Sequence, residues 1–152
     1  MTVVYRPGKT EDLNGLKELA IRSWAQFQSK LTPENWLKLN NTLTDEQTFA
    51  ALLDHSNSFV CTNNKNKIIG MAFLIPSGNP TDIYDKEWSY IRFVTVNPDF
   101  SGQGIGKTLT AMCINAARQN NEKTIALHTS EFMDAARHIY ETLGFTILKE
   151  IN

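Results

Sequence analysis

Residues 96–108 read Val96-Asn97-Pro98-Asp99-Phe100-Ser101-Gly102-Gln103-Gly104-Ile105-Gly106-Lys107-Thr108. They join a β-rich run to a helical pattern, and three glycines alternate with other residues at the junction. Glycine has no Cβ, so the N–H groups of such a loop can turn outward and a ligand can approach them closely. The new helix adds unpaired N–H groups with a partial charge of about +0.5, and Lys107 adds a full charge. The loop therefore predicts an anion site suited to a phosphate or a pyrophosphate.

Three other interpretations fit this loop less well. The glycines could serve only a tight turn, but one glycine is enough for a turn. A dinucleotide-binding G-x-G-x-x-G pattern would need a further glycine at Lys107 or at Leu109. A Walker loop, G-x-x-x-x-G-K-S/T, matches at its end but has Ser101 in place of its first glycine. Only 44 residues (109–152) follow the loop, few for the parallel sheet of such a protein, yet a P-loop-like nucleotide-binding protein stays open as an alternative.

The rest of the chain alternates between β-rich and helical patterns. Strands are expected at residues 3–7, 58–62, 67–75, 88–96, 124–128 and 146–151. Helices are expected from residue 11, from residue 33 after an N-cap at Thr32, from residue 105 and over residues 133–143. Residues 44–47 fit a capping box before another helical stretch, and Gly144 with Phe145 fits a left-handed C-cap. The order β-α-α-β-β-β-α-β-α-β predicts an α/β (α+β) fold, with a mixed sheet and helices on its faces.

Composition excludes several classes of protein. The chain has 152 residues, of which 41% are hydrophobic, so we expect one domain over residues 1–152. The 15 Lys and Arg balance 16 Asp and Glu, without the basic surplus of a nucleic-acid binder. No apolar run reaches the roughly 20 residues of a membrane span, and the N-terminus lacks a signal-peptide pattern. Cys61 and Cys113 lie in apolar stretches and are expected to be buried and reduced, as in a cytoplasmic protein, and no cluster has metal-ligand spacing.

Two segments together resemble a known family. Residues 96–108 are similar to the acetyl-CoA loop of the GCN5-related N-acetyltransferases (GNAT), which reads Arg/Gln-x-x-Gly-x-Gly/Ala after a V-x-P strand end. Residues 135–145 resemble the later A-x-x-x-Y-x-x-x-G-F segment of that family. The two motifs stand in the right order, 34 residues apart between Gly106 and Tyr140. The resemblance implies the acyl-CoA N-acyltransferase fold, with a mostly antiparallel central sheet and helices on both faces.

The resemblance also implies an activity and the residues that carry it. The chain would move an acetyl group from its co-substrate acetyl-CoA to a primary amine of a small molecule or peptide, by direct attack in a ternary complex. Main-chain groups of the preceding strand would bind the pantetheine arm, with the N–H near Val96 facing the thioester carbonyl. Tyr140 would donate a proton to the leaving thiolate, although its spacing also fits a core aromatic. The implied acetyl-CoA site comprises Val94, Thr95, Val96, Ser101, Gly102, Gln103, Gly104, Ile105, Gly106, Lys107 and Thr108.

Two departures from the family pattern leave a further alternative. Ser101 stands where the family usually has Arg or Gln, so one pyrophosphate contact would be lost or pass to Lys107. Met133 stands where many members carry an Asn, which affects a contact to the pantetheine arm. A non-catalytic CoA-binding or interaction module of the same fold therefore stays open beside the enzyme.

The sequence leaves the acceptor and the general base open. Glu87 and His128 are candidate bases, each also explained as a solvated surface residue, and a water chain would serve as well. Asp82 and Asp85 could instead draw a cationic substrate toward the loop after residue 75. We expect no nucleic-acid or membrane partner, and an exposed last strand would let two copies pair as a homodimer.

Overall fold

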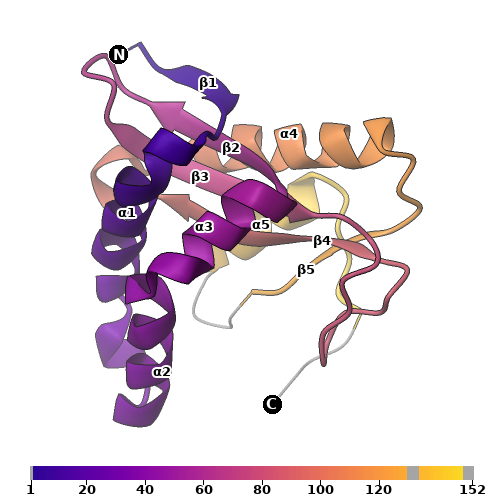
Figure 1. Ribbon diagram of the computed structural model, residues 1–152, viewed down its shortest axis with the longest axis horizontal. Helices are drawn as coiled ribbons and strands as arrows, with labels where there is room; N and C mark the ends of the chain where they lie inside the picture. The colour runs from indigo at the N-terminus through magenta and orange to yellow at the C-terminus, as the bar shows by residue number, and fades with distance from the viewer. Residues whose placement is uncertain (1, 130–133, 149–152) are drawn as a thin grey trace.

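The computed structural model describes residues 2–129 and 134–148, which form an open sheet between helices (Figure 1). The elements in chain order are β1 (Val4–Pro7), α1 (Leu13–Ala25), α2 (Pro33–Thr44), α3 (Glu46–His55), β2 (Asn57–Thr62), β3 (Ile68–Ile75), β4 (Ser89–Val96), α4 (Ile105–Gln119), β5 (Ile125–Leu127) and α5 (Asp134–Thr142). Short 3-10 helices lie at η1 (Thr10–Asp12), η2 (Gln28–Lys30) and η3 (Pro98–Phe100).

The described strands form one sheet in the order β1-β2-β3-β4-β5. The first three pairings are antiparallel and the last, between β4 and β5, is parallel. A parallel pair needs a crossover, and α4 makes it. The predicted mixed and mostly antiparallel sheet is therefore confirmed.

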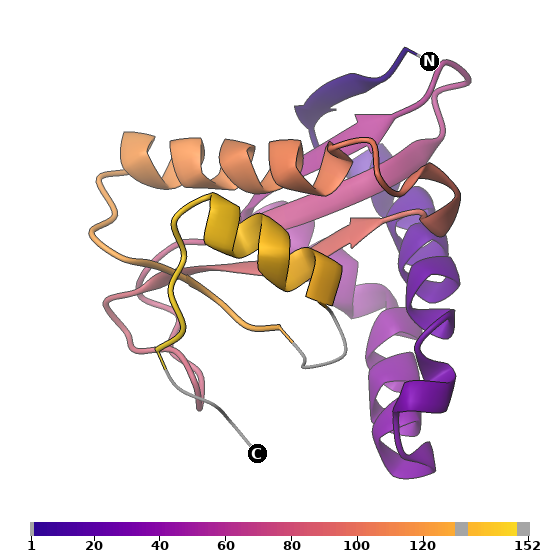
Figure 2. The same cartoon turned by 180° about the vertical axis from the view of Figure 1, so that it is seen from behind.

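Helices cover both faces of this sheet. α1 and α3 lie on one face, where Leu16 and Phe49 pack against Met71 and Phe73 of β3. α4 covers the opposite face, as Figure 2 shows from behind, with α5 beside it. Every residue of β3 is buried, because both of its faces are covered and it has a strand on each side. No helix among the described residues is long and apolar enough to cross a membrane.

The predicted helix ends are confirmed at two places. The Thr32 hydroxyl oxygen accepts a hydrogen bond from the Asn35 amide at 3.1 Å, and Pro33 is the first residue of α2. Gly144 has a φ of +101°, and its amide donates to the Glu141 carbonyl at 3.0 Å. The Phe145 amide donates to the Tyr140 carbonyl, also at 3.0 Å, which completes a Schellman motif at the end of α5.

The region before β2 differs from the prediction in two details. The described chain has α3 as a separate helix, so three α-helices rather than two precede β2. Its N-cap is Asp45, whose carboxylate accepts from the Gln47 amide at 2.9 Å, and not Thr44. The Thr44 hydroxyl instead donates to the Asn40 carbonyl at 2.8 Å, because Thr44 still belongs to the last turn of α2.

The strand expected at residues 146–151 is wrong over its described part. Residues 146–148 are exposed and have no strand pairing, and the remaining positions lie outside the described residues. A β-rich composition makes a strand only where a sheet edge is free to pair with it. The homodimer through this strand stays a prediction.

Candidate functional site

The polypeptide leaves β4 at a residue that the sequence analysis did not single out, Asn97. Asn97 is only 2% exposed, and its amide donates to the Ile69 carbonyl at 2.8 Å. Its side-chain oxygen accepts from the Asp99 amide at 2.9 Å, which caps η3. This buried asparagine therefore sets the direction in which the glycine loop begins. In the sequence, the pair Asn-Pro after a strand was the signal for this cap, but the same pair is explained equally by the end of a strand.

Gly102 and Gly104 hold the loop in a conformation that other residues rarely adopt. Their φ angles are +77° and +78°, and a Cβ at either position would have nothing within 4 Å. The loop therefore faces open space at both glycines. The left-handed backbone, rather than crowding, is what favours glycine there.

The amides from Gly102 to Lys107 have no hydrogen-bond acceptor in the described part of the chain. The first amide engaged by the new helix is that of Thr108, which donates to the Gly104 carbonyl at 3.0 Å. Gly104 is the N-cap residue, and it has no side chain to cap the helix. The loop and the first turn of α4 therefore present a run of free donors at the positive end of a helix dipole.

Gly106 joins this loop to α5. A Cβ on Gly106 would lie 3.6 Å from Val96 Cγ2 and 3.7 Å from Ile139 Cδ1. The end of β4, the start of α4 and the middle of α5 thus meet at one point. The two segments that resemble the GNAT motifs are brought together by the fold.

β4 carries a bulge in its middle. Met71 of β3 pairs with Thr95 and Phe73 pairs with Arg92, so that two residues of β4, 93 and 94, oppose Ala72 alone. Phe93 has a φ of +53°, a left-handed conformation that is uncommon for an aromatic residue. A bulge shifts the alternation of side chains between the two faces of a sheet. Arg92 and Phe93 consequently both face the α1/α3 side, and Val94 returns to the α4 core.

Beyond the bulge, β4 has a free side. β5 pairs with β4 only at residues 89–91. The described chain therefore places no strand against residues 92–96 on the side of β5. In this stretch the Val96 carbonyl accepts from the Ser23 hydroxyl at 3.4 Å, and the Phe93 carbonyl accepts from the Thr95 hydroxyl at 3.0 Å. The other main-chain groups that point to this side are open to another extended segment, as at a sheet edge.

Tyr140 lies in α5 beside Ile139, and it is 8% exposed. Burial, with smaller effects from Cys113 and Tyr84, raises the pKa of its phenol to about 12. Its ring meets Phe145 edge to face, with centroids 6.1 Å apart. Its hydroxyl has no hydrogen-bond partner among residues 2–129 and 134–148. Tyr140 thus serves as a core aromatic and keeps a free, protonated donor.

Among the other predicted residues, Thr95 and Ile105 are buried, and those that follow lie at the surface or outside the described residues. Ser101, Gln103 and Lys107 are exposed in the loop. Glu87 and His128 are exposed as well, so neither is held in a dry environment. Met133 lies outside the described residues.

The cysteines are both buried, as predicted. Burial raises the pKa of the Cys113 thiol to about 12, and it also raises that of Cys61. A thiol in such surroundings stays protonated at neutral pH and is a poor nucleophile. The described residues also contain no group of three His, Cys, Asp or Glu side chains placed to hold a metal.

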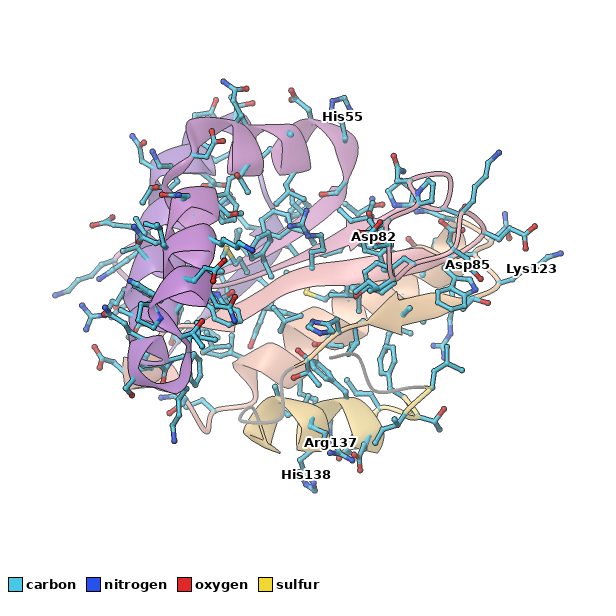
Figure 3. All side chains as sticks on the ribbon, turned by 90° about the horizontal axis from the view of Figure 1, so that it is seen from below. His55, Asp82, Asp85, Lys123, Arg137 and His138 are labelled. Atoms are coloured by element: carbon cyan, nitrogen blue, oxygen red, sulfur yellow. The ribbon has the colours of Figure 1, made fainter. Side chains whose placement is uncertain are left out.

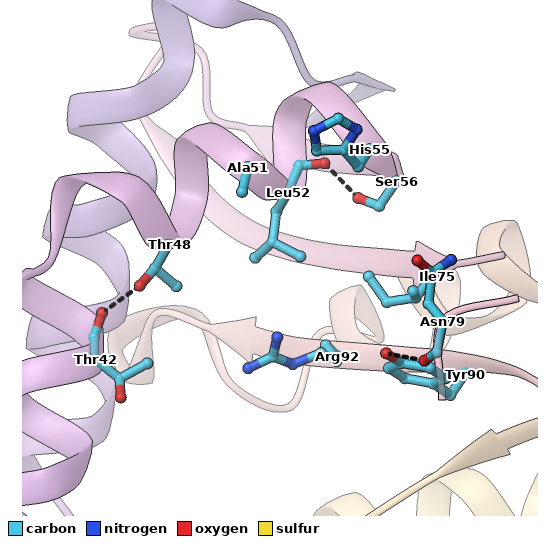
Figure 4. Close-up of a pocket in the computed structure, with 10 residues that line it drawn as sticks. All are labelled: Thr42, Thr48, Ala51, Leu52, His55, Ser56, Ile75, Asn79, Tyr90 and Arg92. Carbon is cyan, nitrogen blue, oxygen red and sulfur yellow. Dashed lines mark hydrogen bonds between the residues drawn. The ribbon is translucent and has the colours of Figure 1, made fainter. Parts of the chain in front are cut away.

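A cavity of about 320 Å³ opens on the α1/α3 face of the sheet, where α3 passes over β3 and β4 (Figure 4). Its wall includes Arg92, the residue just before the bulge, and Tyr90, whose hydroxyl donates to the Asn79 carbonyl at 3.0 Å. No pattern in the sequence singled out Arg92. Asp82 and Asp85 lie on the loop between β3 and β4, seen in Figure 3, and do not line this cavity.

The family comparison agrees with this geometry. A model of the acetyltransferase (GNAT) family matches residues 18–145. Human N-acetyltransferase 8B is 26% identical over 98 residues, or 64% of this chain and 42% of that protein. The probable N-acetyltransferase camello of Xenopus laevis is 30% identical over 102 residues, or 62% of this chain and 44% of that protein. The matched regions thus span less than half of either relative.

Solved structures share the fold over nearly the whole chain. The PaiA N-acetyltransferase of Thermoplasma acidophilum, solved in complex with coenzyme A, has a TM-score of 0.79 at 15% identity and covers 97% of this chain and 91% of its own. A predicted acetyltransferase from Clostridium acetobutylicum, solved with acetyl-CoA, has a TM-score of 0.73 at 22% identity and covers 99% and 96%. At these identities the likeness shows the fold.

Proposed function

The chain belongs to the GNAT family of acetyltransferases, and from that premise we propose that it transfers an acetyl group from acetyl-CoA to a primary amine of a small molecule or peptide. The observation that carries the proposal is the run of free amides from Gly102 to Lys107 beside the unpaired side of β4. The first feature suits a diphosphate, and the second suits an extended amide-bearing arm. A P-loop-like protein would explain the first feature alone.

The residues present fit acetyl-CoA as a co-substrate. Amides of residues 102–107 would hold the diphosphate, and the exposed Lys107 would add charge from the first turn of α4. The main chain of residues 94–96 would hold the pantetheine arm as an added strand. Ser101 is exposed and has a short side chain, so the cradle would depend on the main chain more than in relatives with Arg or Gln there.

The chemistry would be a direct attack by the amine on the thioester carbonyl carbon. The main-chain N–H near Val96 would stabilise the developing oxyanion, a contribution of about 3 kcal/mol to the barrier in comparable sites. The buried, protonated thiols of Cys61 and Cys113 argue against an acyl-enzyme. Glu87, His128 or ordered water would take the proton from the amine.

Tyr140 would then protonate the leaving thiolate. A phenol with a pKa of about 12 is a weaker acid than an ordinary thiol, so this step needs a matching environment. Cys113 shows how burial affects a thiol in this protein, because burial raises the pKa of its thiol to about 12, the same value as for the Tyr140 phenol. A thiolate that leaves into equally dry surroundings would be basic enough to accept the proton from Tyr140.

The proposal is tested by binding and by turnover. We expect CoA and acetyl-CoA to raise the melting temperature in proportion to the logarithm of their concentration, and ATP to leave it unchanged. Acetyl transfer to a panel of primary amines would then be followed by release of free thiol. CoA binding without transfer to any amine would favour the non-catalytic module. Magnesium-dependent binding of ATP without CoA binding would favour the P-loop alternative.

The role of Tyr140 is tested by Tyr140→Phe. We expect turnover to fall about a hundredfold while the affinity for CoA stays within a few-fold, since only the proton donor is removed. Tyr84→Phe is the matched control, because Tyr84 is also buried with its pKa raised to about 12. Undiminished turnover of the Tyr140 variant would remove this residue from the mechanism.

A further inference from the structure

The cavity under α3 has an unusual balance of charge. Its lining, over the described residues, consists of Thr42, Thr48, Ala51, Leu52, His55, Ser56, Ile75, Asn79, Tyr90 and Arg92. Arg92 supplies a permanent positive charge to this lining, which contains no carboxylate. An acceptor that is only a cation would meet no opposite charge there. This cavity therefore suits a ligand that carries an anionic group.

Within the described part of the chain, no acidic group neutralises the charge of Arg92. No ion pair or hydrogen bond of its side chain is found within residues 2–129 and 134–148. Its guanidinium instead lies 4.7 Å from the ring centroid of Phe93. Arg92 is exposed, and this cation–π contact favours the position of its guanidinium while leaving its N–H donors free. Figure 4 shows the side chain extending from β4 into the space beneath α3.

The bulge links this arginine to the proposed acetyl-CoA site. The side chains of Arg92 and Phe93 both lie on the α1/α3 side of the sheet, whereas Val94 packs into the α4 core. Arg92 is also the first residue of β4 beyond its pairing with β5. Val96, beside the proposed position of the thioester carbonyl, is four residues from Arg92, at most about 13 Å of strand. The extended arginine side chain covers part of this span, so a compact acceptor can reach both the guanidinium and the thioester. The cavity volume of about 320 Å³ suits a small molecule.

We propose that the acceptor is a small amine that also bears a carboxylate, and that Arg92 binds this carboxylate and sets the specificity. The inference rests on the proposed acetyl transfer and names its acceptor class. The Arg fork can donate two parallel hydrogen bonds to a carboxylate, and this leaves the amine end of the acceptor free to face the thioester.

The test compares each amino acid with its own amide. L-Phenylalanine, glycine and β-alanine are assayed against L-phenylalaninamide, glycinamide and β-alaninamide, with acetyl-CoA and the full chain. We expect kcat/KM for at least one acid to exceed that for its amide by about tenfold or more. Amine basicity cannot produce this preference, because a neighbouring carboxylate stabilises the unreactive ammonium form.

Three variants complete the test. Arg92→Gln should abolish the preference by weakening transfer to the acid, with little change for the amide or for CoA affinity. Arg92→Lys should retain part of it, since it keeps the charge and loses the fork. Arg118→Gln is the matched control, because Arg118 is an exposed cation near the end of α4, away from the cavity lining, and it should keep the full preference.

The outcomes separate the two levels of the proposal. Equal transfer to acid and amide, or a preference that survives Arg92→Gln, would overturn the assignment of Arg92 and leave acetyl transfer intact. Transfer to neither member of any pair, nor to any amine of the wider panel, would overturn acetyl transfer and the acceptor class with it.

Discussion

The helices α2 and α4 begin in opposite ways. At α2, the Thr32 hydroxyl oxygen accepts from the Asn35 amide, and Glu34 lies in the first turn. At α4, Gly104 offers no side-chain cap, and Lys107 lies in the first turn without any acidic neighbour there. A negative side chain stabilises a helix N-terminus, and a positive one does the reverse.

The protein's own side chain caps the N-terminus of α2, whereas the N-terminal amides of α4 are left free to bind a ligand. α3 also has its own cap, the carboxylate of Asp45. The N-terminus of α4 leaves its amides free in the described chain and adds a cation where the helix alone would prefer an anion. The arrangement is favourable only if an anion binds there, which is the reason for the diphosphate assignment.

The largest effect is expected from Gly106→Asp. This change would put a carboxylate among the free amides, and we expect CoA affinity to fall by about a hundredfold or more through competition and repulsion. Gly106→Ala is the matched control, since its Cβ would make ordinary contacts of 3.6 and 3.7 Å. The alanine variant should keep CoA binding and gain about 0.5–1 kcal/mol in unfolding free energy. Calorimetry and thermal unfolding would measure both, and wild-type CoA affinity in the Asp variant would refute the loop assignment.

A second prediction concerns the start of α1, where Asp12 forms an ion pair with Arg6. The Asp12 side chain is 7% exposed, and its two oxygens accept from the Arg6 guanidinium at 2.8 Å each. The Arg6 hydrogen bonds outweigh the effect of burial and lower the Asp12 carboxyl pKa. We expect Asp12→Asn to reduce the unfolding free energy by about 1–2 kcal/mol at pH 7.

The pH dependence of that loss follows from the direction of the shift. A lowered carboxyl pKa stabilises the fold above the unfolded value of about 3.9, and this contribution is lost as the pH falls through the folded value. Urea unfolding of wild type and Asp12→Asn should therefore converge as the pH is lowered below 4. Asp54→Asn, a change at an exposed carboxylate, is the control and should cost little at any pH. A gap that stays constant with pH would show that packing, and not charge, explains the loss.

Thr32→Ala is expected to have an intermediate effect on stability and none on ligand binding. Removing this cap leaves the Asn35 amide without its acceptor, and we expect a loss of about 1 kcal/mol in unfolding free energy. Thr32→Ser, which keeps the hydroxyl, should restore most of it. Chemical denaturation measures the loss. Weakened CoA binding in this variant would contradict the assignment of ligand binding to the N-terminus of α4 and not to that of α2.

The smallest effect is expected from Lys107→Gln. We expect the ligand-free protein to gain about 0.3–0.5 kcal/mol in stability, because a cation is removed from the positive end of the dipole. CoA affinity should fall a few-fold at the same time. Lys123→Gln removes another exposed cation, from the loop before β5, and should change neither quantity. Lower stability of the Lys107 variant would show that Lys107 does not destabilise the N-terminus of α4, which would contradict the comparison between α2 and α4.

Local signals in the sequence predicted most of the elements and the site loop. The cap at Thr32, the left-handed Gly144 and the glycines before α4 each depend on residues within about one helical turn, so the sequence shows them directly. The family pattern at residues 96–108 and 135–145 predicted that the loop and Tyr140 belong to one site. In the structure α5 lies so close to Gly106 that a Cβ there would contact Ile139 at 3.7 Å.

Only the tertiary structure decided which residues share a face and where strands find partners. The left-handed Phe93 and the bulge it makes depend on register against β3, which no local pattern encodes. For the same reason the sequence did not reveal that Arg92 reaches the cavity under α3, nor that residues 146–148 lack a strand partner. Composition and periodicity determine which elements form, whereas contacts between distant segments determine their edges, their bulges and the cavity between them.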